Sequence, residues 1–219
     1  MTDATARSAR VMVRAALKAA LATADASSHT PYASMILLAT TLEGEPLTLI
    51  SSLARHTRNL GQTAFASILV DTSNAAGDAT TGGRISLMGR FTEDKSQASR
   101  ARFLARHPAA SGYADFADFT FYRMTIESAH FIEGFGRIVP LPGPTLYARI
   151  DDPAGFAAAE PGFLANLRQR WPFVTGFDAE GVDLIVNGHG ERVPFDRPAT
   201  DAAIAHAAAS ICLAAAPFH

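Results

Sequence analysis

Apolar and polar positions alternate along several short segments of the first 140 residues, and this alternation is typical of β-strands. Six segments show it: 32–41, 47–52, 65–71, 84–91, 119–126 and 130–137. The first two flank the short glycine-containing turn L-E-G-E-P, which predicts a β-hairpin. A set of six short antiparallel strands tends to close into a barrel, because closure removes exposed strand edges.

Helical spacing of apolar residues occurs between these strands. Within residues 4–24, Val13, Leu17 and Leu21 recur at every fourth position, which predicts an amphipathic helix packed on the domain. A membrane-binding or partner-binding surface is the alternative interpretation of this basic segment. A short helix is expected near Asn59 and a second over 93–107, capped by Thr92. The arginines of the second helix are interpreted as a solvent-exposed face.

The stretch P-L-P-G-P at 140–144 marks a boundary, because the sequence after it is rich in alanine and follows a different pattern. Helices are expected over 156–171 and 200–216, with strands at 181–187 and 192–195 between them. The expected fold is therefore α+β and mainly β. A six-stranded antiparallel split β-barrel over 1–141 is followed by a small C-terminal α/β domain over 145–219.

Composition narrows the function classes. Hydrophobic residues make up 48 % of the 219 residues and charged ones 18 %, so a sizeable core is expected. The net charge of −2 argues against nucleic-acid binding. A single cysteine, Cys212, excludes an internal disulfide and a cysteine-only metal cluster. The chain shows neither a segment long enough to span a membrane nor a signal peptide, so we expect a cytoplasmic protein without membrane partners.

The stretch S-S-L-A-R-H-T-R at 51–58 gathers the most suggestive chemistry. Ser51 and Ser52 end a predicted strand, and Arg55, His56 and Thr57 begin the short helix that follows. Backbone amides at a helix N-terminus, arginine side chains and hydroxyls are the groups that hold phosphate. The sequence thus predicts a site for a phosphate-bearing ligand. The alternative is a solvated surface helix that follows an ordinary loop.

The order of these segments resembles the pyridoxamine 5′-phosphate oxidase-like, FMN-binding split-barrel proteins. The stretch S-S-L-A-R-H-T-R-N-L is the most specific part of this resemblance, which covers residues 4–141. Together with the G-F-G segment at 134–136, it is most similar to the haem-utilisation branch. The tail resembles a small domain often appended to that branch. It departs from it at F-L-A-N-L-R-Q-R-W, where an H-M-N-x-D-H-like motif would be expected.

This resemblance implies FMN as the cofactor and a homodimer that shares its sites between subunits. The implied contacts are to the phosphate (Ser51, Ser52, Arg55, His56, Thr57), to the ribityl chain and ring (Ser34, Met35), to the ring's polar edge (Arg84), and from the partner subunit (Arg137). The dimer face is expected where four aromatic residues cluster in the sequence: Phe119, Phe121, Phe131 and Phe135.

Three functions remain open at this point. A flavin-dependent oxidoreductase of unknown small-molecule substrate is the first, a haem-binding or haem-degrading protein the second, and a non-catalytic flavin-binding module the third. No residue stands out as a general base or nucleophile, which fits a reaction carried by a cofactor. The tail histidines His189, His206 and His219 have neither metal-binding spacing nor an evident orienting carboxylate. We therefore expect the tail to pack on the barrel.

Overall fold

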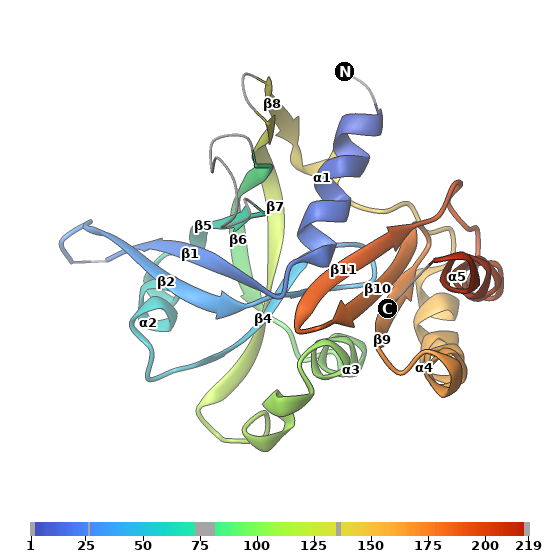
Figure 1. The fold of residues 1–219 in the computed structure, drawn as a ribbon. Coiled ribbons are helices and arrows are strands. Elements are labelled where there is room, and N and C mark those ends of the chain that lie inside the picture. Colours follow the sequence, from blue (N-terminus) through green and yellow to red (C-terminus); the bar gives the residue numbers. More distant parts are fainter. Residues whose placement is uncertain (1–2, 26, 73–81, 135–136, 217–219) are drawn as a thin grey trace.

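The computed structural model describes residues 3–25, 27–72, 82–134 and 137–216, and it is mainly β (Figure 1). The larger sheet contains β1 (Lys18–Ala24), β2 (Pro31–Leu37), β3 (Ala39–Thr40), β4 (Pro46–Ser51), β5 (Phe65–Asp71), β6 (Arg84–Glu93), β7 (Phe119–Gly134) and β8 (Arg137–Pro142). Its strand order is β2-β1-β5-β6-β7-β4-β3, and β8 also pairs with β7. Every pairing is antiparallel, and the sheet curls into a half-barrel of the split-barrel kind.

The remaining elements are helices and a smaller sheet. The helices are α1 (Asp3–Ala15), α2 (Arg55–Gln62), α3 (Gln97–Arg106), α4 (Pro153–Arg170) and α5 (Ala202–Ala215), with the 3-10 turns η1 (Pro108–Gly112) and η2 (Gly143–Leu146). The smaller sheet has the order β11-β10-β9 and comprises β9 (Val174–Asp178), β10 (Gly181–Val186) and β11 (His189–Pro194). No helix in the described part of the chain is both long and apolar enough to cross a membrane.

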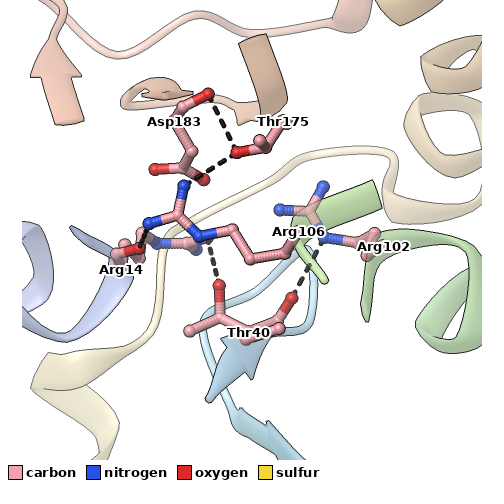
Figure 2. Close-up of a pocket in the computed structure, with 8 residues that line it drawn as sticks. Arg14, Thr40, Arg102, Arg106, Thr175 and Asp183 are labelled. Carbon is pink, nitrogen blue, oxygen red and sulfur yellow. Dashed lines mark hydrogen bonds between the residues drawn. The ribbon is translucent and has the colours of Figure 1, made fainter. Parts of the chain in front are cut away.

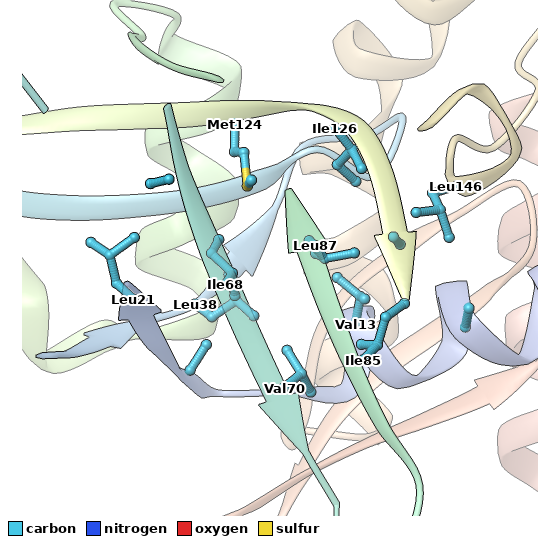
Figure 3. Packing of buried hydrophobic residues seen from close by; sticks show 14 of the residues in the cluster. Val13, Leu21, Leu38, Ile68, Val70, Ile85, Leu87, Met124, Ile126 and Leu146 are labelled. Atoms are coloured by element: carbon cyan, nitrogen blue, oxygen red, sulfur yellow. The ribbon is translucent and has the colours of Figure 1, made fainter. Parts of the chain in front are cut away.

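The core of the half-barrel lies between the inner face of the large sheet and α1 (Figure 3). Leu21, Ile68 and Leu87 face each other across β1, β5 and β6, and Val13 of α1 packs against the same cluster. Alternate residues of each strand are buried, so the intervening residues form an outer face. One face of this sheet therefore packs in the core, and the other face points outward.

The segment Lys18–Ala24 is a strand, whereas the helical spacing predicted one helix from residue 4 to residue 24. Ala19, Leu21 and Thr23 are buried while the residues between them are exposed, which is a strand alternation. Five of the seven residues are alanine or leucine, and these favour helices, so the alternation is hidden in the sequence. Pairing with β2 and β5 decides the outcome, and the sheet has eight strands rather than six.

The C-terminal part has its own core between α4, α5 and the small sheet. Its predicted helices and its last two strands are present, but β9 was not predicted. Leu42, from the loop before β4, is buried in this C-terminal core. The division at residues 141–145 stays a prediction, because buried contacts continue across it.

Helix α3 begins later than the sequence indicated. Strand β6 continues to Glu93, and the helix is capped by Ser96, whose Oγ accepts a hydrogen bond from the Ser99 amide. Thr92 therefore lies within the strand and is not the cap. Because the helix packs against β9, Arg102 and Arg106 face the C-terminal part, whereas Arg100 forms an ion pair with the exposed Asp115.

Candidate functional site

The residues of the predicted phosphate site lie where β4 ends and α2 begins. The backbone turns after Ser51, whose carbonyl accepts a hydrogen bond from the Ala54 amide at 3.0 Å. The Ser51 hydroxyl also accepts a hydrogen bond from the Leu53 amide at 3.1 Å. These contacts place Arg55 at the first position of α2, as the sequence predicted.

Asp118 lies against both serines of this turn. The Ser51 hydroxyl donates a hydrogen bond to Asp118 Oδ2 at 2.6 Å, and the Ser52 amide donates one to the Asp118 carbonyl oxygen at 2.7 Å. A carboxylate therefore stands where the sequence predicted that an anion would bind. No local sequence pattern indicated this contact, because Asp118 follows Ser51 by 67 positions.

Arg55 is also engaged within the chain. Its Nη2 donates a hydrogen bond to Asp25 Oδ2 at 3.0 Å, and its guanidinium lies 4.8 Å from the centre of the Tyr32 ring. Hydrogen bonds from Ser27 and Arg55 hold the pKa of the Asp25 carboxyl well below its usual range. The hairpin turn between β1 and β2 thus supplies an anion to the predicted anion site.

His56 and Ser34, both predicted site residues, lie close together although they belong to different elements. His56 Nδ1 and Ser34 Oγ are 3.0 Å apart, and burial lowers the pKa of the imidazole. The other ring nitrogen of this histidine, His56 Nε2, and the neighbouring Thr57 Oγ1 are buried and have no hydrogen-bond partner in the described part of the chain. Unsatisfied buried groups of this kind often mark a place where water or a ligand binds.

The remaining predicted site residues lie elsewhere. Met35 is 63 % exposed on the outer face of β2. Arg84 begins β6, three strands away from β2 in the sheet order. Arg137 forms an ion pair with Glu133 at 2.8 Å and donates a hydrogen bond to the hydroxyl of Thr5 at 3.2 Å. Within one protomer, these three residues lie apart from the group of residues at the start of α2, called here the α2 cluster: Ser51, Ser52, Arg55, His56 and Thr57. A contribution of Arg137 to a partner subunit stays a prediction.

A second group of arginines lies between α1, α3 and the small sheet (Figure 2). We call it the buried arginine cluster: Arg14, Arg102, Arg106 and Arg192, with the carboxylates of Glu160, Asp178 and Asp183. Arg14 and Arg192 each contact the Asp178 carboxylate at 2.7 Å, and Arg192 also contacts Asp183 at 2.7 Å. Burial raises the pKa of Asp178, but Arg14 and Arg192 outweigh it and hold this pKa below its usual range.

Arg102 and Arg106 connect α3 to both parts of the chain. Arg102 forms an ion pair with Glu160 of α4 and donates a hydrogen bond to the Thr40 carbonyl at 3.1 Å. Arg106 donates to the Thr175 hydroxyl at 2.7 Å and to the Ala15 carbonyl at 2.6 Å. The cavity that these arginines line measures about 10 Å³, room for roughly one water molecule. The cluster therefore joins the two parts of the chain and leaves no room for a substrate.

The outer face of the large sheet carries a neutral surface that the sequence did not reveal. One line of paired residues crosses six strands and is called here the outer row: Met35, Ala20, Leu69, Ser86, His130 and Pro140. The row contains no Asp, Glu, Lys or Arg. Leu69 is 40 % exposed, and Ile138, beside the row on β8, is 58 % exposed. Apolar side chains are thus exposed on a sheet face that is open to solvent, and the charged pair Asp71 and Arg84 lies next to the row.

The aromatic residues expected at the dimer face lie mostly inside the protein. Phe131 is 1 % exposed in the half-barrel core, and Phe121 packs edge-on against the buried Phe103 of α3. Phe119 stacks obliquely on Tyr113 at 4.8 Å. Phe135 lies outside the described residues. Phe131 therefore cannot lie in a dimer face, and α3 and η1 pack over Phe119 and Phe121; the dimer itself stays a prediction.

A family comparison places this architecture. The model of the family described as "CREG, beta-barrel" matches residues 2–148, more than half of the chain. The chain belongs to the CREG β-barrel family. This family lies in the FMN-binding split-barrel, pyridoxamine 5′-phosphate oxidase-like group, so the resemblance inferred from S-S-L-A-R-H-T-R-N-L is confirmed.

One protein of similar sequence and two solved structures of similar fold are compared with this CREG-family chain. The chloroplastic heme oxygenase HOZ of Arabidopsis thaliana is 35 % identical over 107 residues, which are 48 % of this chain and 32 % of HOZ. The chain thus spans about a third of that relative. The structure of Atu2129 from Agrobacterium tumefaciens C58 has a TM-score of 0.81 at 23 % identity, covering 93 % of this chain and 92 % of its own.

A heme binding protein from Mycobacterium smegmatis has a TM-score of 0.62 at 23 % identity and covers 98 % of this chain and 99 % of its own. At this identity the two solved structures show a shared fold. Because both alignments extend over the C-terminal part, that part belongs to the shared architecture.

Proposed function

We propose that this protein binds haem through the outer face of its large sheet. The supporting geometric observation is that the predicted phosphate site is already paired within the chain, Arg55 with Asp25 and Ser51 with Asp118. The outer row, in contrast, presents neutral side chains to solvent. Similarity to a relative named as a heme oxygenase supports the same choice, over the aligned 48 % of the chain.

Estimates of electrostatic energies favour haem over FMN as the ligand. A charge-assisted hydrogen bond to phosphate contributes roughly 1.5–3 kcal/mol. Two like unit charges 4 Å apart repel by about 4 kcal/mol at the effective dielectric constant of about 20 that applies near a protein surface. A phosphate beside Ser51 would meet the Asp118 carboxylate and would also have to displace Asp25 from Arg55. Asp118 therefore opposes the binding of a dianion there, whereas displacement of Asp25 from its exposed pair with Arg55 costs little.

The residues of the outer face fit the chemistry of haem. A macrocycle needs apolar contact surface, a nitrogen, sulfur or oxygen ligand for its iron, and cations for its carboxylates. The face supplies exposed Met35, Leu69 and Ile138, the imidazole of His130, and Arg84 at the start of β6. When bound, haem supplies the redox chemistry of iron, while the protein binds and orients the macrocycle and controls access to it.

Titration with ferric haemin tests the proposal. We expect a saturable Soret shift with one haem per chain, and a slow loss of Soret absorbance after ascorbate is added in air if the protein also degrades haem. A non-saturable absorbance change, equal to the change that haemin gives with an unrelated β-sheet protein in the same buffer, would contradict haem binding. Saturable binding without loss of absorbance would assign haem binding alone.

FMN binding is the second candidate, and one observation favours it. His56 Nε2 and Thr57 Oγ1 are buried without partners at the start of α2, where a phosphate would need donors. If FMN binds there, Arg55→Ala should weaken it roughly ten- to hundredfold, the loss of one charge-assisted contact. FAD should bind more weakly than FMN, because the site would enclose a terminal phosphate.

Quenching of flavin fluorescence measures both affinities. Equal FMN affinity of the wild type and Arg55→Ala would remove this assignment. If FMN binds but is not reduced by NADH or NADPH, the chain is a flavin-binding module; if it is reduced, a flavin-dependent oxidoreductase is supported.

A homodimer remains part of the proposal, with the outer face as its contact surface. Met35 and Leu69 are large apolar side chains exposed on this face, and such surfaces frequently mark interfaces. Sedimentation at micromolar concentration, with and without haemin, measures the association. A 23.2-kDa monomer under both conditions would exclude the dimer and leave the haem proposal standing.

A further inference from the structure

We propose that His130 is the axial ligand of the haem iron. This inference rests on the proposed function and assigns a residue to it. The sequence suggested tail histidines as the candidates, whereas the three-dimensional structure directs attention to a strand of the half-barrel. The proposal depends on where β7 places the imidazole and on what surrounds it.

The side chain of His130 points away from the core. Its neighbours in β7, Ala129 and Phe131, are both buried in the half-barrel, so the alternation of the strand sends His130 to the outer face. His130 is exposed there and is paired with Ser86 on β6 and Pro140 on β8. It thus lies on a central strand, flanked on both sides, and not at a flexible edge.

Apolar side chains lie near this imidazole, beyond its direct cross-strand neighbours Ser86 and Pro140. Ile132, two residues along β7, is paired with Ile138 of β8, which is 58 % exposed. Leu69 lies on the other side, one strand beyond Ser86. In the described part of the chain, four of the eight exposed large hydrophobic residues lie on this one sheet face: Met35, Phe65, Leu69 and Ile138. A flat apolar ligand can cover several of them at once.

The same face carries a cation and an orienting hydroxyl. Arg84 is the cross-strand partner of Ile132 on one side and of Asp71 on the other, and it shares the outer face with Ser86. Strand geometry places its Cα about 8 Å from that of His130, in reach of a carboxylate on a macrocycle bound at the imidazole. The Ser86 side chain is a direct cross-strand neighbour of His130, and such pairs have Cβ atoms about 5 Å apart. Its hydroxyl can hydrogen-bond the second ring nitrogen and fix the ring, as ligand histidines require.

Other described histidines are used differently. His107 Nε2 lies 2.8 Å from the Leu38 carbonyl, and His56 Nδ1 contacts Ser34. His206 stacks on Phe163 at 4.7 Å and contacts Asn166. His189 begins β11 at the hairpin, where it pairs with Val186 and is followed by Gly190 and Glu191. Because it is an exposed imidazole outside the large sheet, it serves as the matched control.

Spectroscopic titration of the full-length chain with ferric haemin tests His130 directly. Three variants are compared with the wild type: His130→Ala, Ser86→Ala and the control His189→Ala. We expect His130→Ala to lose the wild-type Soret position and low-temperature EPR signature and to bind haemin at least about tenfold more weakly, because even outer-shell partners of a ligand are worth 10- to 100-fold. Ser86→Ala should keep the ligation with a smaller loss of affinity, and His189→Ala should match the wild type.

Added imidazole should restore the wild-type Soret position in His130→Ala, because it replaces the missing ligand without restoring the chain. Equal thermal unfolding midpoints of the apo variants would establish that the fold is unchanged. If the wild type binds haemin and His130→Ala has the same spectrum and affinity, the assignment of His130 is wrong while the proposed function stands. If the wild type binds no haemin, both are wrong.

Discussion

Two groups of arginines in this protein differ in burial, although both lie in short basic stretches of the sequence. Arg55 and Arg58 open helix α2 and are exposed, with partners in the adjacent turn and in the hairpin tip. Arg102 and Arg106 lie on helix α3 in a similar basic stretch, but their side chains are buried. A basic helix therefore does not reveal whether its cations face solvent, a ligand or another part of the chain.

The difference comes from the elements that cover each helix. Helix α2 packs on β1 and β2, so one face of it remains open. Helix α3 packs between β3 and β9, and residues 58 to 92 positions away accept the hydrogen bonds of Arg102 and Arg106. Buried ions need such partners, since an isolated one would lose its hydration without compensation. Stability should thus depend on the buried cluster and little on the α2 cluster.

The largest expected effect is that of Asp178→Ala. This carboxylate is fully buried and contacts both Arg14 and Arg192, so its removal leaves two guanidiniums without their main counter-ion. Breaking a buried pair in this way costs about 3–5 kcal/mol in the free energy of unfolding. Urea unfolding followed by circular dichroism measures it. Asp115→Ala, which removes an exposed pair with Arg100, should cost roughly 0–1 kcal/mol, and equal effects of the two changes would contradict the comparison.

A smaller loss is expected for Arg106→Lys. Lysine keeps the charge but lacks the planar fork that joins the Thr175 hydroxyl to the Ala15 and Leu184 carbonyls. Leaving buried acceptors unsatisfied should lower the free energy of unfolding by about 1–3 kcal/mol. Arg100→Lys on the same helix is the control and should change little. A stability of Arg106→Lys equal to that of the control would show that the fork is dispensable.

Stability should also fall as the solution becomes more acidic. Burial lowers the pKa of His107, and burial likewise lowers that of His56, so the native state binds fewer protons than the unfolded state once the pH drops below about 6.5. The free energy of unfolding should therefore decrease from pH 7.5 to pH 5.5. His107→Gln should reduce this slope. A thermal midpoint independent of pH over this range would be the contrary result.

The smallest effect on stability is expected for Arg55→Ala. Its ion pair with Asp25 is solvent-exposed, and exposed pairs often contribute nothing measurable. We expect an unchanged unfolding midpoint together with unchanged haemin binding. A marked loss of stability would place the α2 cluster among the structural ion pairs and remove the contrast with α3.

Much of the half-barrel was predictable because its signals are local. The strands around residues 47–51, 65–71 and 84–91 have alternating patterns, and the stretch S-S-L-A-R-H-T-R-N-L identified the family. The resemblance assigned His56 and Ser34 to one cofactor site, but it did not predict their direct contact. For the strands and the family, the information lies within about ten neighbouring residues.

Other features depended on contacts that no local pattern encodes. Asp118 reaches Ser51 across 67 positions, and Arg10 binds Glu180 across 170. Lys18–Ala24 became a strand because β2 and β5 were available to pair with it on both sides. The position of His130 in the outer row likewise follows from the registers of β6, β7 and β8.

The sequence by itself determined the kind of element at most positions, the family, and the residue types gathered at the end of β4, because side-chain periodicity and turn chemistry are local properties. The tertiary structure alone decided which charges are paired, which arginines are buried and which histidine faces an apolar surface. The physical reason is that burial and charge pairing depend on distances between residues far apart in the chain. Those distances exist only after the sheet has curled and the C-terminal part has packed against α1 and α3.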